Sequence, residues 1–118
     1  MHFMAKYECG LQGNFNDLLA AVEKGILSGS ASASFEDGSD YENEGIRCAV
    51  RVYERYSMIG GNRVSLNVTL LGKGKDLFIS AITSGGSQAV FFKINTIGEG
   101  TFLDCLVAIV EEFKNPRE

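Results

Sequence analysis

Two segments of the chain repeat their hydrophobic residues at three- and four-residue steps, the spacing that places side chains on one face of an α-helix. The first is residues 14–29, where Asn14 or Asn16 can serve as the cap. The second is residues 100–114, with Thr101 as a suitable cap and Pro116 as a stop. The two predicted apolar faces consist of Phe15, Leu18, Leu19, Val22 and Ile26, and of Phe102, Leu103, Leu106, Ile109, Val110 and Phe113.

Six other segments have the composition or the alternation of β-strands. Residues 46–56 and 63–71 alternate most clearly, with an apolar side chain at every second position. The stretch EDGSDYENEG (36–45) is rich in acidic and turn-forming residues, so we predict a solvent-exposed loop there. The six predicted strands are residues 4–12, 30–35, 46–56, 63–71, 76–84 and 88–96.

The adjacent glycines in SAITSGGSQ allow two interpretations. A two-residue hairpin turn at Gly85–Gly86 needs positive φ at both positions, which glycine adopts without strain, and it places Ile79 opposite Phe92. A phosphate-binding P-loop requires the motif G-x-x-x-x-G-K-[ST] at the start of a helix, whereas this stretch starts a predicted strand. We therefore favour the turn, and anion binding by its backbone is the alternative.

Paired strands are expected to place their apolar side chains on the same face of the sheet. This requirement predicts the register of the other two hairpins. We expect a five-residue loop at 57–61 and a two-residue turn at Lys73–Gly74. Residues 46–97 then form a four-stranded antiparallel meander with one apolar face, which the two helices are expected to cover. The predicted inward pairs are Val52 with Leu66, Val50 with Val68, Cys48 with Leu70, Leu70 with Leu77, and Val68 with Ile79.

These elements predict a two-layer α+β fold, with an antiparallel sheet of about five or six strands and both helices on one face. A chain of 118 residues suits a single domain, residues 1–118, with a core from about residue 4 to residue 114. Its composition, 45% hydrophobic and 22% charged, is typical of a globular protein that folds without disulfides or a structural metal.

The predicted register also assigns the residues of the opposite sheet face, which is the candidate surface for a ligand or a partner. It mixes guanidinium, phenol and phenyl groups, and it places Arg55 directly opposite Arg63, an unfavourable pair of like charges. The candidate site residues on this face are Arg47, Arg51, Tyr53, Arg55, Arg63, Asn67, Phe78, Phe91 and Lys93.

Three interpretations of that face remain open. The arginines are solvated, with the acidic segment 36–44 folded over them. Alternatively, a second copy or another protein buries the face, since Tyr, Phe and Arg are enriched in interface cores. In the third interpretation, Arg47, Arg51, Arg55 and Arg63 bind a small anionic molecule.

The charge distribution follows the predicted elements. The net charge is −4, yet residues 46–98 contain seven basic and two acidic residues, so the basic character is concentrated in the meander. The acidic total and the absence of an RNP-type motif make nucleic acid an unlikely partner. No apolar run reaches the ~20 residues that span a bilayer, and MHFMAKYECG does not resemble a secretory signal, so we expect a cytoplasmic protein.

Few residues suggest catalytic chemistry. Cys9, Cys48 and Cys105 are far apart in sequence, and we expect reduced thiols. The only histidine is His2, which disfavours a metal site or a histidine-dependent triad, and no motif indicates a cofactor. Glu54 is either a carboxylate of perturbed pKa on the inner face or, as we favour, a residue at the rim that pairs with a basic neighbour. No motif places a nucleophile beside a base, which disfavours an enzyme.

The stretches RCAVRVYERYSMIGGNRVSLNVTLLG and SAITSGGSQAVFFKINTIGE resemble a family of small single-domain proteins from Gram-positive anaerobic bacteria, known as a domain of unknown function. The resemblance extends from about Met4 to Phe113 and implies a bacterial, intracellular protein without an assigned activity. The order of elements is also similar to that of helix-grip ligand binders, in which a curved sheet wraps a C-terminal helix, but this likeness is one of topology alone.

From these observations we predict a non-catalytic interaction module that self-associates through the exposed Arg/Tyr/Phe sheet face, most simply as a homodimer. The alternative is a helix-grip-like binder of a small anionic or amphipathic ligand. An enzyme is the least favoured hypothesis.

Overall fold

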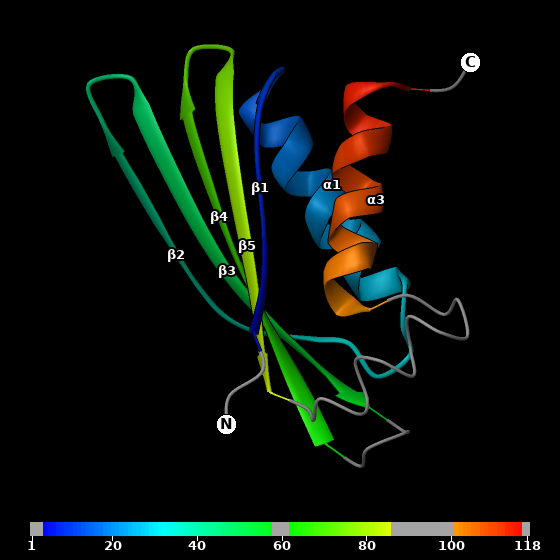
Figure 1. Cartoon of the computed structure of the whole chain (residues 1–118). Helices are drawn as coiled ribbons and strands as arrows, with labels where there is room; N and C mark the ends of the chain where they lie inside the picture. The colour runs from blue at the N-terminus through cyan, green and yellow to red at the C-terminus, as the bar shows by residue number, and fades with distance from the viewer. Residues whose placement is uncertain (1–3, 58–61, 86–100, 117–118) are drawn as a thin grey trace.

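The structure, a computed structural model, describes residues 4–57, 62–85 and 101–116. Five strands form one antiparallel sheet in the order β1-β5-β4-β3-β2, and two helices complete the described part of the chain (Figure 1). This confirms the predicted α+β class. The elements are β1 (Met4–Gln12), α1 (Phe15–Ser28), β2 (Ser34–Asn43), β3 (Ile46–Ser57), β4 (Asn62–Lys73), β5 (Asp76–Gly85) and α3 (Phe102–Lys114).

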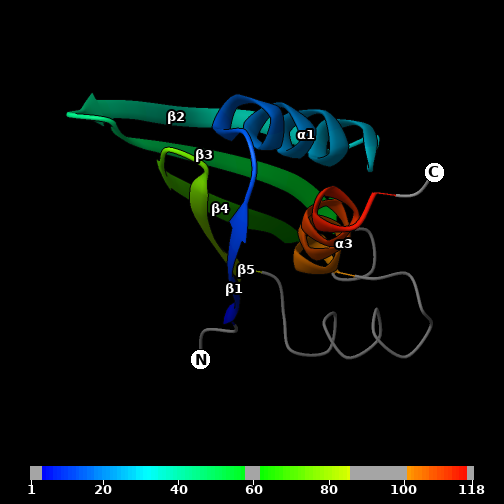
Figure 2. The same cartoon turned by 90° about the horizontal axis from the view of Figure 1, so that it is seen from above.

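Both helices lie on the same side of the sheet, which curves around them when seen from above (Figure 2). Asn14 caps α1 by accepting a hydrogen bond from the Asp17 backbone N–H, and Thr101 caps α3 in a reciprocal capping box with Asp104. The two helix predictions are therefore confirmed. The core between the layers includes Leu18, Val22 and Ile26 of α1, Leu106 and Val110 of α3, and Leu66, Val68, Leu70 and Ile79 of the sheet.

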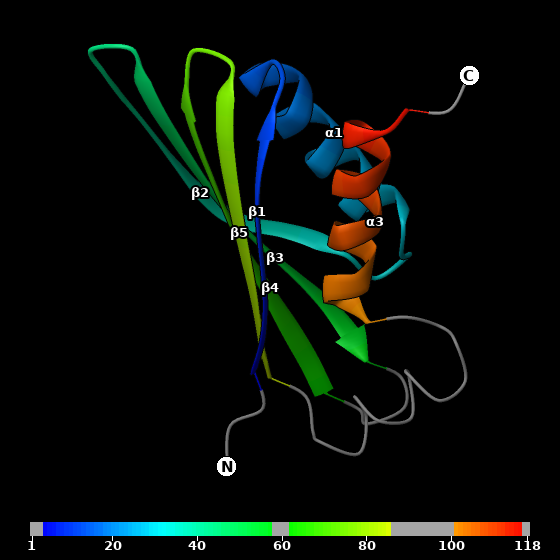
Figure 3. The same cartoon turned by 45° about the horizontal axis from the view of Figure 1, so that its top comes forward.

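The predicted strand 4–12 is confirmed as β1, and it lies beside β5 (Figure 3). The prediction for residues 30–45 was wrong. Residues 34–43 form β2, which pairs with β3 through a bulge between Phe35 and Asp37, and Glu44–Gly45 makes the turn with φ of 50° and 83°. Almost every residue of β2 is exposed, so the apolar alternation that indicates a strand is missing from it.

The turn between β4 and β5 lies one residue later than predicted. Lys73 pairs with Asp76, so Gly74 (φ 60°) and Lys75 form the turn, and Leu70 faces Ile79 instead of Leu77. The pairing register moves by two residues, which leaves every side chain on its predicted face because strand side chains alternate with period two. Leu66, Val68, Leu70, Leu77 and Ile79 are buried under the helices as expected.

The register between β3 and β4 differs from the prediction by a single residue. Tyr53, not Val52, lies opposite Leu66, and Ser57 pairs with Asn62. A one-residue slip moves every side chain of a strand to the other face. The side of β3 that faces the helices therefore contains Arg47, Ala49, Arg51, Tyr53 and Arg55, and the outer side contains Ile46, Cys48, Val50 and Val52.

The diglycine hairpin cannot be compared with the structure over its full length. Gly85 ends β5, pairs with Val64 and has a φ of 101°, a left-handed conformation that suits glycine. The rest of the predicted turn, the predicted strand 88–96 and its pairing of Ile79 with Phe92 lie outside the described residues.

Gly25 of α1 packs closely against α3. A Cβ atom at this position would lie 2.4 Å from Cδ1 and 2.7 Å from Cγ1 of Ile109 on α3. In an open helix alanine is more stabilising than glycine by ~1 kcal/mol. Here we expect Gly25→Ala to lower the free energy of unfolding by about 1–3 kcal/mol in urea titrations, because the added methyl group overlaps Ile109.

The control for this prediction is the same change in an Ile109→Ala background. There the obstacle is absent, so Gly25→Ala should cost less or become stabilising. A gain in stability from Gly25→Ala alone would contradict the close helix contact.

Candidate functional site

β3 presents three arginines toward the helices at every fourth residue. Arg47, Arg51 and Arg55 were predicted on the open outer face, together with Tyr53, and this placement was wrong for all four. The cause is the one-residue register difference, which exchanges the two faces of the strand.

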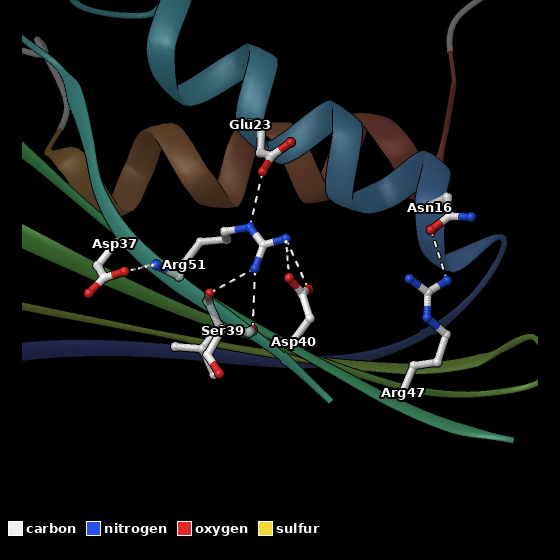
Figure 4. Close-up of polar contacts among 9 residues, drawn as sticks. Asn16, Glu23, Asp37, Ser39, Asp40, Arg47 and Arg51 are labelled. Carbon is white, nitrogen blue, oxygen red and sulfur yellow. Dashed lines mark hydrogen bonds and ion pairs between the residues drawn. The ribbon is translucent and has the colours of Figure 1, made fainter. Parts of the chain in front are cut away.

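The Arg51 side chain is largely enclosed, with 12% of its surface exposed. Its Nε–H donates to Glu23 Oε2 of α1 (3.0 Å), and Nη2 donates to both carboxylate oxygens of Asp40 on β2 (3.0 and 3.3 Å). Nη1 donates to the carbonyl oxygens of Val50 (2.9 Å) and Ser39 (3.3 Å) (Figure 4). Each nitrogen of the guanidinium thus has a protein acceptor, and Arg51 joins α1 and β2 to β3.

Burial opposes the charge on Arg51, but the hydrogen bonds to Glu23 and Asp40 outweigh it and raise the pKa of the guanidinium. The first of the three interpretations is thus right that the acidic segment contacts an arginine, and wrong that this arginine is solvated on the outer face. The acidic segment makes this contact as an edge strand rather than as a loop.

The other two arginines lie against aromatic rings at the helix starts. The Arg47 guanidinium carbon is 4.1 Å from the centre of the Phe15 ring, and its Nη1 donates to Asn16 Oδ1 (2.8 Å) (Figure 4). The corresponding distance from Arg55 to the Phe102 ring is 4.9 Å. These cation–π contacts explain how the guanidinium groups fit beneath the helices.

Tyr53 is fully buried between the layers, and the Phe35 ring packs edge-on against it at 6.0 Å. Among the described residues its hydroxyl has no hydrogen-bond partner. Burial, with a smaller contribution from the Glu23 carboxylate, raises the pKa of Tyr53 to about 12, and Arg51 opposes this shift. Sequence reasoning placed this side chain on the wrong face and so could not identify a buried phenol.

The remaining predicted site residues divide into two groups. Arg63, Asn67 and Phe78 lie on the outer face as predicted, and Phe91 and Lys93 lie outside the described residues. Arg55 pairs with Val64, so the predicted pair of like charges does not form. Arg63 instead donates to Glu54 at 2.8 Å, which confirms the favoured interpretation that Glu54 pairs with a basic neighbour. Whether any of these residues bind a ligand or a partner stays a prediction.

The outer face contains an apolar surface, of which the sequence analysis placed Ile46 and Cys48 inside and Phe78 outside. We call its five central members the outer apolar patch. Four of these side chains are exposed by 40–64%, and Cys48 is half-buried. A hollow of about 260 Å³ adjoins the patch where β3 begins and β4 and β5 meet at their turn. The members of the outer apolar patch are Tyr41, Ile46, Cys48, Leu71 and Phe78. The alternation of residues 46–52 showed that Ile46 and Cys48 share one face of the strand. The sequence analysis assigned that face to the core because its side chains are hydrophobic.

A second polar cluster joins β1 to the last turn of α3. Tyr7 donates to Glu111 (3.1 Å), and Lys114 contacts both Glu111 (3.4 Å) and the Cys9 sulfur (3.5 Å). Burial, together with bonds to Cys9 and Glu111, raises the pKa of Tyr7. Within the described residues no group of three or more His, Cys, Asp or Glu side chains is arranged to hold a metal ion.

Residues 4–114 match a family described as "Family of unknown function (DUF6054)". The chain belongs to this family. No curated protein matches it. No helix in the described ranges has the length and apolar character needed to cross a membrane.

Several solved structures are similar at low identity. The protein PA94 from Pseudomonas aeruginosa, of unknown function, is 10% identical, with a TM-score of 0.49 and coverage of 84% of this chain and 78% of that one. Ara h 8.0201 is 10% identical, with a TM-score of 0.48 and coverage of 94% and 99%. Norcoclaurine synthase from Thalictrum flavum is 11% identical, with a TM-score of 0.37 and coverage of 98% of both chains. At these scores the likenesses do not bear on what this chain binds.

Arg51 and Arg63 offer a matched test of the arginine contacts. Arg51→Ala removes a side chain that bonds Glu23, Asp40 and two backbone carbonyls, and it detaches α1 and β2 from β3. Because the two carboxylates are 42% and 63% exposed and stay solvated, we expect a loss of about 1–3 kcal/mol in the free energy of unfolding. Arg63→Ala removes one ion pair whose arginine is 52% exposed, and we expect a loss below ~1 kcal/mol. Equal losses in urea denaturation would show that Arg51 is not a structural link.

Tyr53→Phe tests whether the buried hydroxyl is unpaired. At pH 7 we expect the variant to be as stable as the parent or slightly more stable, because no hydrogen bond is lost. The phenol of the unfolded chain ionises near its ordinary pKa of 10.0, whereas the native phenol retains its proton to about 12. The parent should therefore lose about 1–3 kcal/mol relative to Tyr53→Phe as pH rises through this window.

Urea unfolding of both proteins at pH 7 and pH 11 measures this difference. A loss of more than ~1 kcal/mol in Tyr53→Phe at pH 7 would mean that the hydroxyl has a partner in solution.

Proposed function

We propose that the protein is a non-catalytic interaction module that self-associates through the outer face of its sheet. The outer apolar patch is the observation on which this proposal depends. No described helix lies over this face, since α1 and α3 both pack on the other side (Figure 2). Soluble monomers rarely expose contiguous apolar patches beyond a few hundred Å², and larger ones mark interaction sites.

The size of the outer face suits a dimer of this chain. β3 and β4 each contain 12 residues, which is about 40 Å of extended strand, and five strands are about 20 Å across. The face is therefore on the order of 800 Å², close to the area that each partner buries in a standard interface.

The charges on this face also permit two copies to meet. The chain has a net charge of −4, but basic and acidic groups nearly balance on the outer face. Arg63 pairs with Glu54, and Lys73 is the cross-strand neighbour of Asp76. The remaining charged side chains that the strand register places there are Lys6, Glu8 and Asp37. Two such faces therefore repel each other less than the net charge of the chain implies.

A small amphipathic molecule between the sheet and the helices is a second candidate, supported by the Tyr53 hydroxyl, which has no hydrogen-bond partner in the part of the chain that the structure describes. The saturated donors of Arg51 argue against an anionic ligand at that position. A bound molecule that hydrogen-bonds Tyr53 would reverse the result expected for Tyr53→Phe, because the variant would then lose stability at neutral pH.

Leu71→Lys tests the proposal directly. Leu71 is 41% exposed on the central strand β4, near its turn with β5, and a charge there would be buried without a partner in the dimer. We expect sedimentation equilibrium to show a dimer for the parent at high micromolar concentration, and a dissociation constant at least ~30-fold higher for Leu71→Lys.

The matched control is Leu27→Lys. Leu27 is 42% exposed on α1, in the other layer, so the chemical change and its exposure are nearly the same. This variant should dimerise like the parent. A parent that remains monomeric, or an equal loss in both variants, would contradict the proposal.

A further inference from the structure

The outer face is complementary to a copy of itself. We infer that two copies pack outer face to outer face about a two-fold axis that runs parallel to the strands and passes over β4. β4 is the middle strand of the five described, so the axis superposes β1 on β2 and β5 on β3 of the second copy. This inference rests on the proposed self-association and specifies its geometry.

The first observation is the row of residues that crosses the sheet at the level of Leu71. Cross-strand pairs connect, in order, Gly10, Phe78, Leu71, Cys48 and Tyr41. A two-fold axis over β4 reverses this order. Tyr41 then lies over Gly10 of the second copy, where no side chain projects, Phe78 lies over the small Cys48, and Leu71 meets Leu71. Tyr41 and Phe78 thus each face a small residue, and the two Leu71 side chains meet at the axis, an arrangement that permits close packing between two sheets.

The second observation is the row at the level of Asn67, which runs through Lys6, Ile82, Asn67, Val52 and Asp37. Reversal of this row places Ile82 over Val52 and Asn67 over Asn67. It also places Lys6 of each copy nearest to Asp37 of the other. Because the sheet curves around the helices, the edge strands of the two copies diverge, so these opposite charges face each other across the open rim of the interface (Figure 2). Between these two rows, Thr69 lies at the axis and Ser80 faces Val50, so no like charges are opposed there. At the far end of β4 the axis brings Arg63 of both copies together, each paired with Glu54 of its own chain.

A two-fold axis perpendicular to the strands matches the face less well. With this axis each strand would lie over the same strand of the second copy, and the two strands would run in opposite directions. The outer apolar patch lies near the turns at Glu44–Gly45 and Gly74–Lys75, which share one end of the sheet (Figure 1). An axis at that level would leave most of the outer face beyond the overlap. The parallel axis superposes the strands along their full length, in the aligned class of sheet packing.

The contact ends near the turns. There the parallel axis brings Lys73 of both copies together, at the rim of the interface, where lysine stems lie over apolar surface and the ammonium groups reach water. The contact at Lys73 contributes little to the stability of the dimer. The arrangement of the two copies is determined by the rows at Leu71 and Asn67.

The decisive experiment reverses the charges of Lys6 and Asp37. Within one chain these residues lie on the two outermost described strands, about 19 Å apart, so they cannot pair with each other. Lys6→Glu alone opposes two carboxylates at each edge of the dimer, and Asp37→Lys alone opposes two ammonium groups. We expect each single variant to raise the dimer dissociation constant about tenfold or more at low salt.

The double variant Lys6→Glu, Asp37→Lys restores the pairs with reversed polarity, so its dissociation constant should return to within about threefold of the parent. Lys24→Glu, on α1, is the control for the change in net charge and should leave dimerisation close to that of the parent. Raising the ionic strength should reduce the effects of the single variants.

The outcomes separate this inference from the proposed function. If Leu71→Lys dissociates the dimer but the double variant shows no rescue, the arrangement about β4 is wrong and self-association through the outer face stands. If the parent does not dimerise, both are overturned. Circular dichroism melts of each variant establish that a lost dimer is not a lost fold.

Discussion

Arg51 brings a positive charge into the space between the sheet and the helices, and two carboxylates from two other elements neutralise it there. A buried guanidinium is tolerated only when its charge is paired and its donors are satisfied. Glu23 of α1, Asp40 of β2 and two backbone carbonyls meet this requirement. The contacts form only when the Arg51 side of β3 faces inward, so this ion cluster supports one register of the strand against the other.

That orientation determines what both faces of the sheet can do. Inside, the guanidinium groups of Arg47 and Arg55 lie on aromatic rings of the helices, and Tyr53 and Ala49 join the core. Outside, the apolar side of β3 remains exposed beside Leu71 and Phe78. The polar interior and the apolar exterior therefore have the same origin, because the side of β3 that contains the arginines is the side that faces the helices.

Periodicity alone predicted the elements whose two sides differ clearly in polarity. α1, α3, β4 and β5 have apolar residues on one side, and their buried faces were predicted correctly, even where the turn between β4 and β5 lies one residue later than expected. β2 was missed because nearly all of its side chains are exposed. β3 was predicted as a strand but with its faces exchanged, because Ile46, Cys48, Val50 and Val52 favour burial by hydrophobicity. For the same reason, four residues of the predicted site were placed on the wrong face of the sheet, namely Arg47, Arg51, Tyr53 and Arg55.

The amino-acid sequence by itself determined the two layers, the helix caps and the alternation of every strand except β2, because these depend on contacts and preferences within a few residues. Only the tertiary structure decided which side of β3 faces the helices. That choice depends on Glu23, Phe15 and Phe102 of the helices and on Asp40 of the edge strand, which lie far from the arginines in sequence or on a segment without a strand pattern. Hydrophobicity compares the two sides of a strand by the residues of that strand alone. The energy of a buried ion depends also on the partners that the whole fold brings to it.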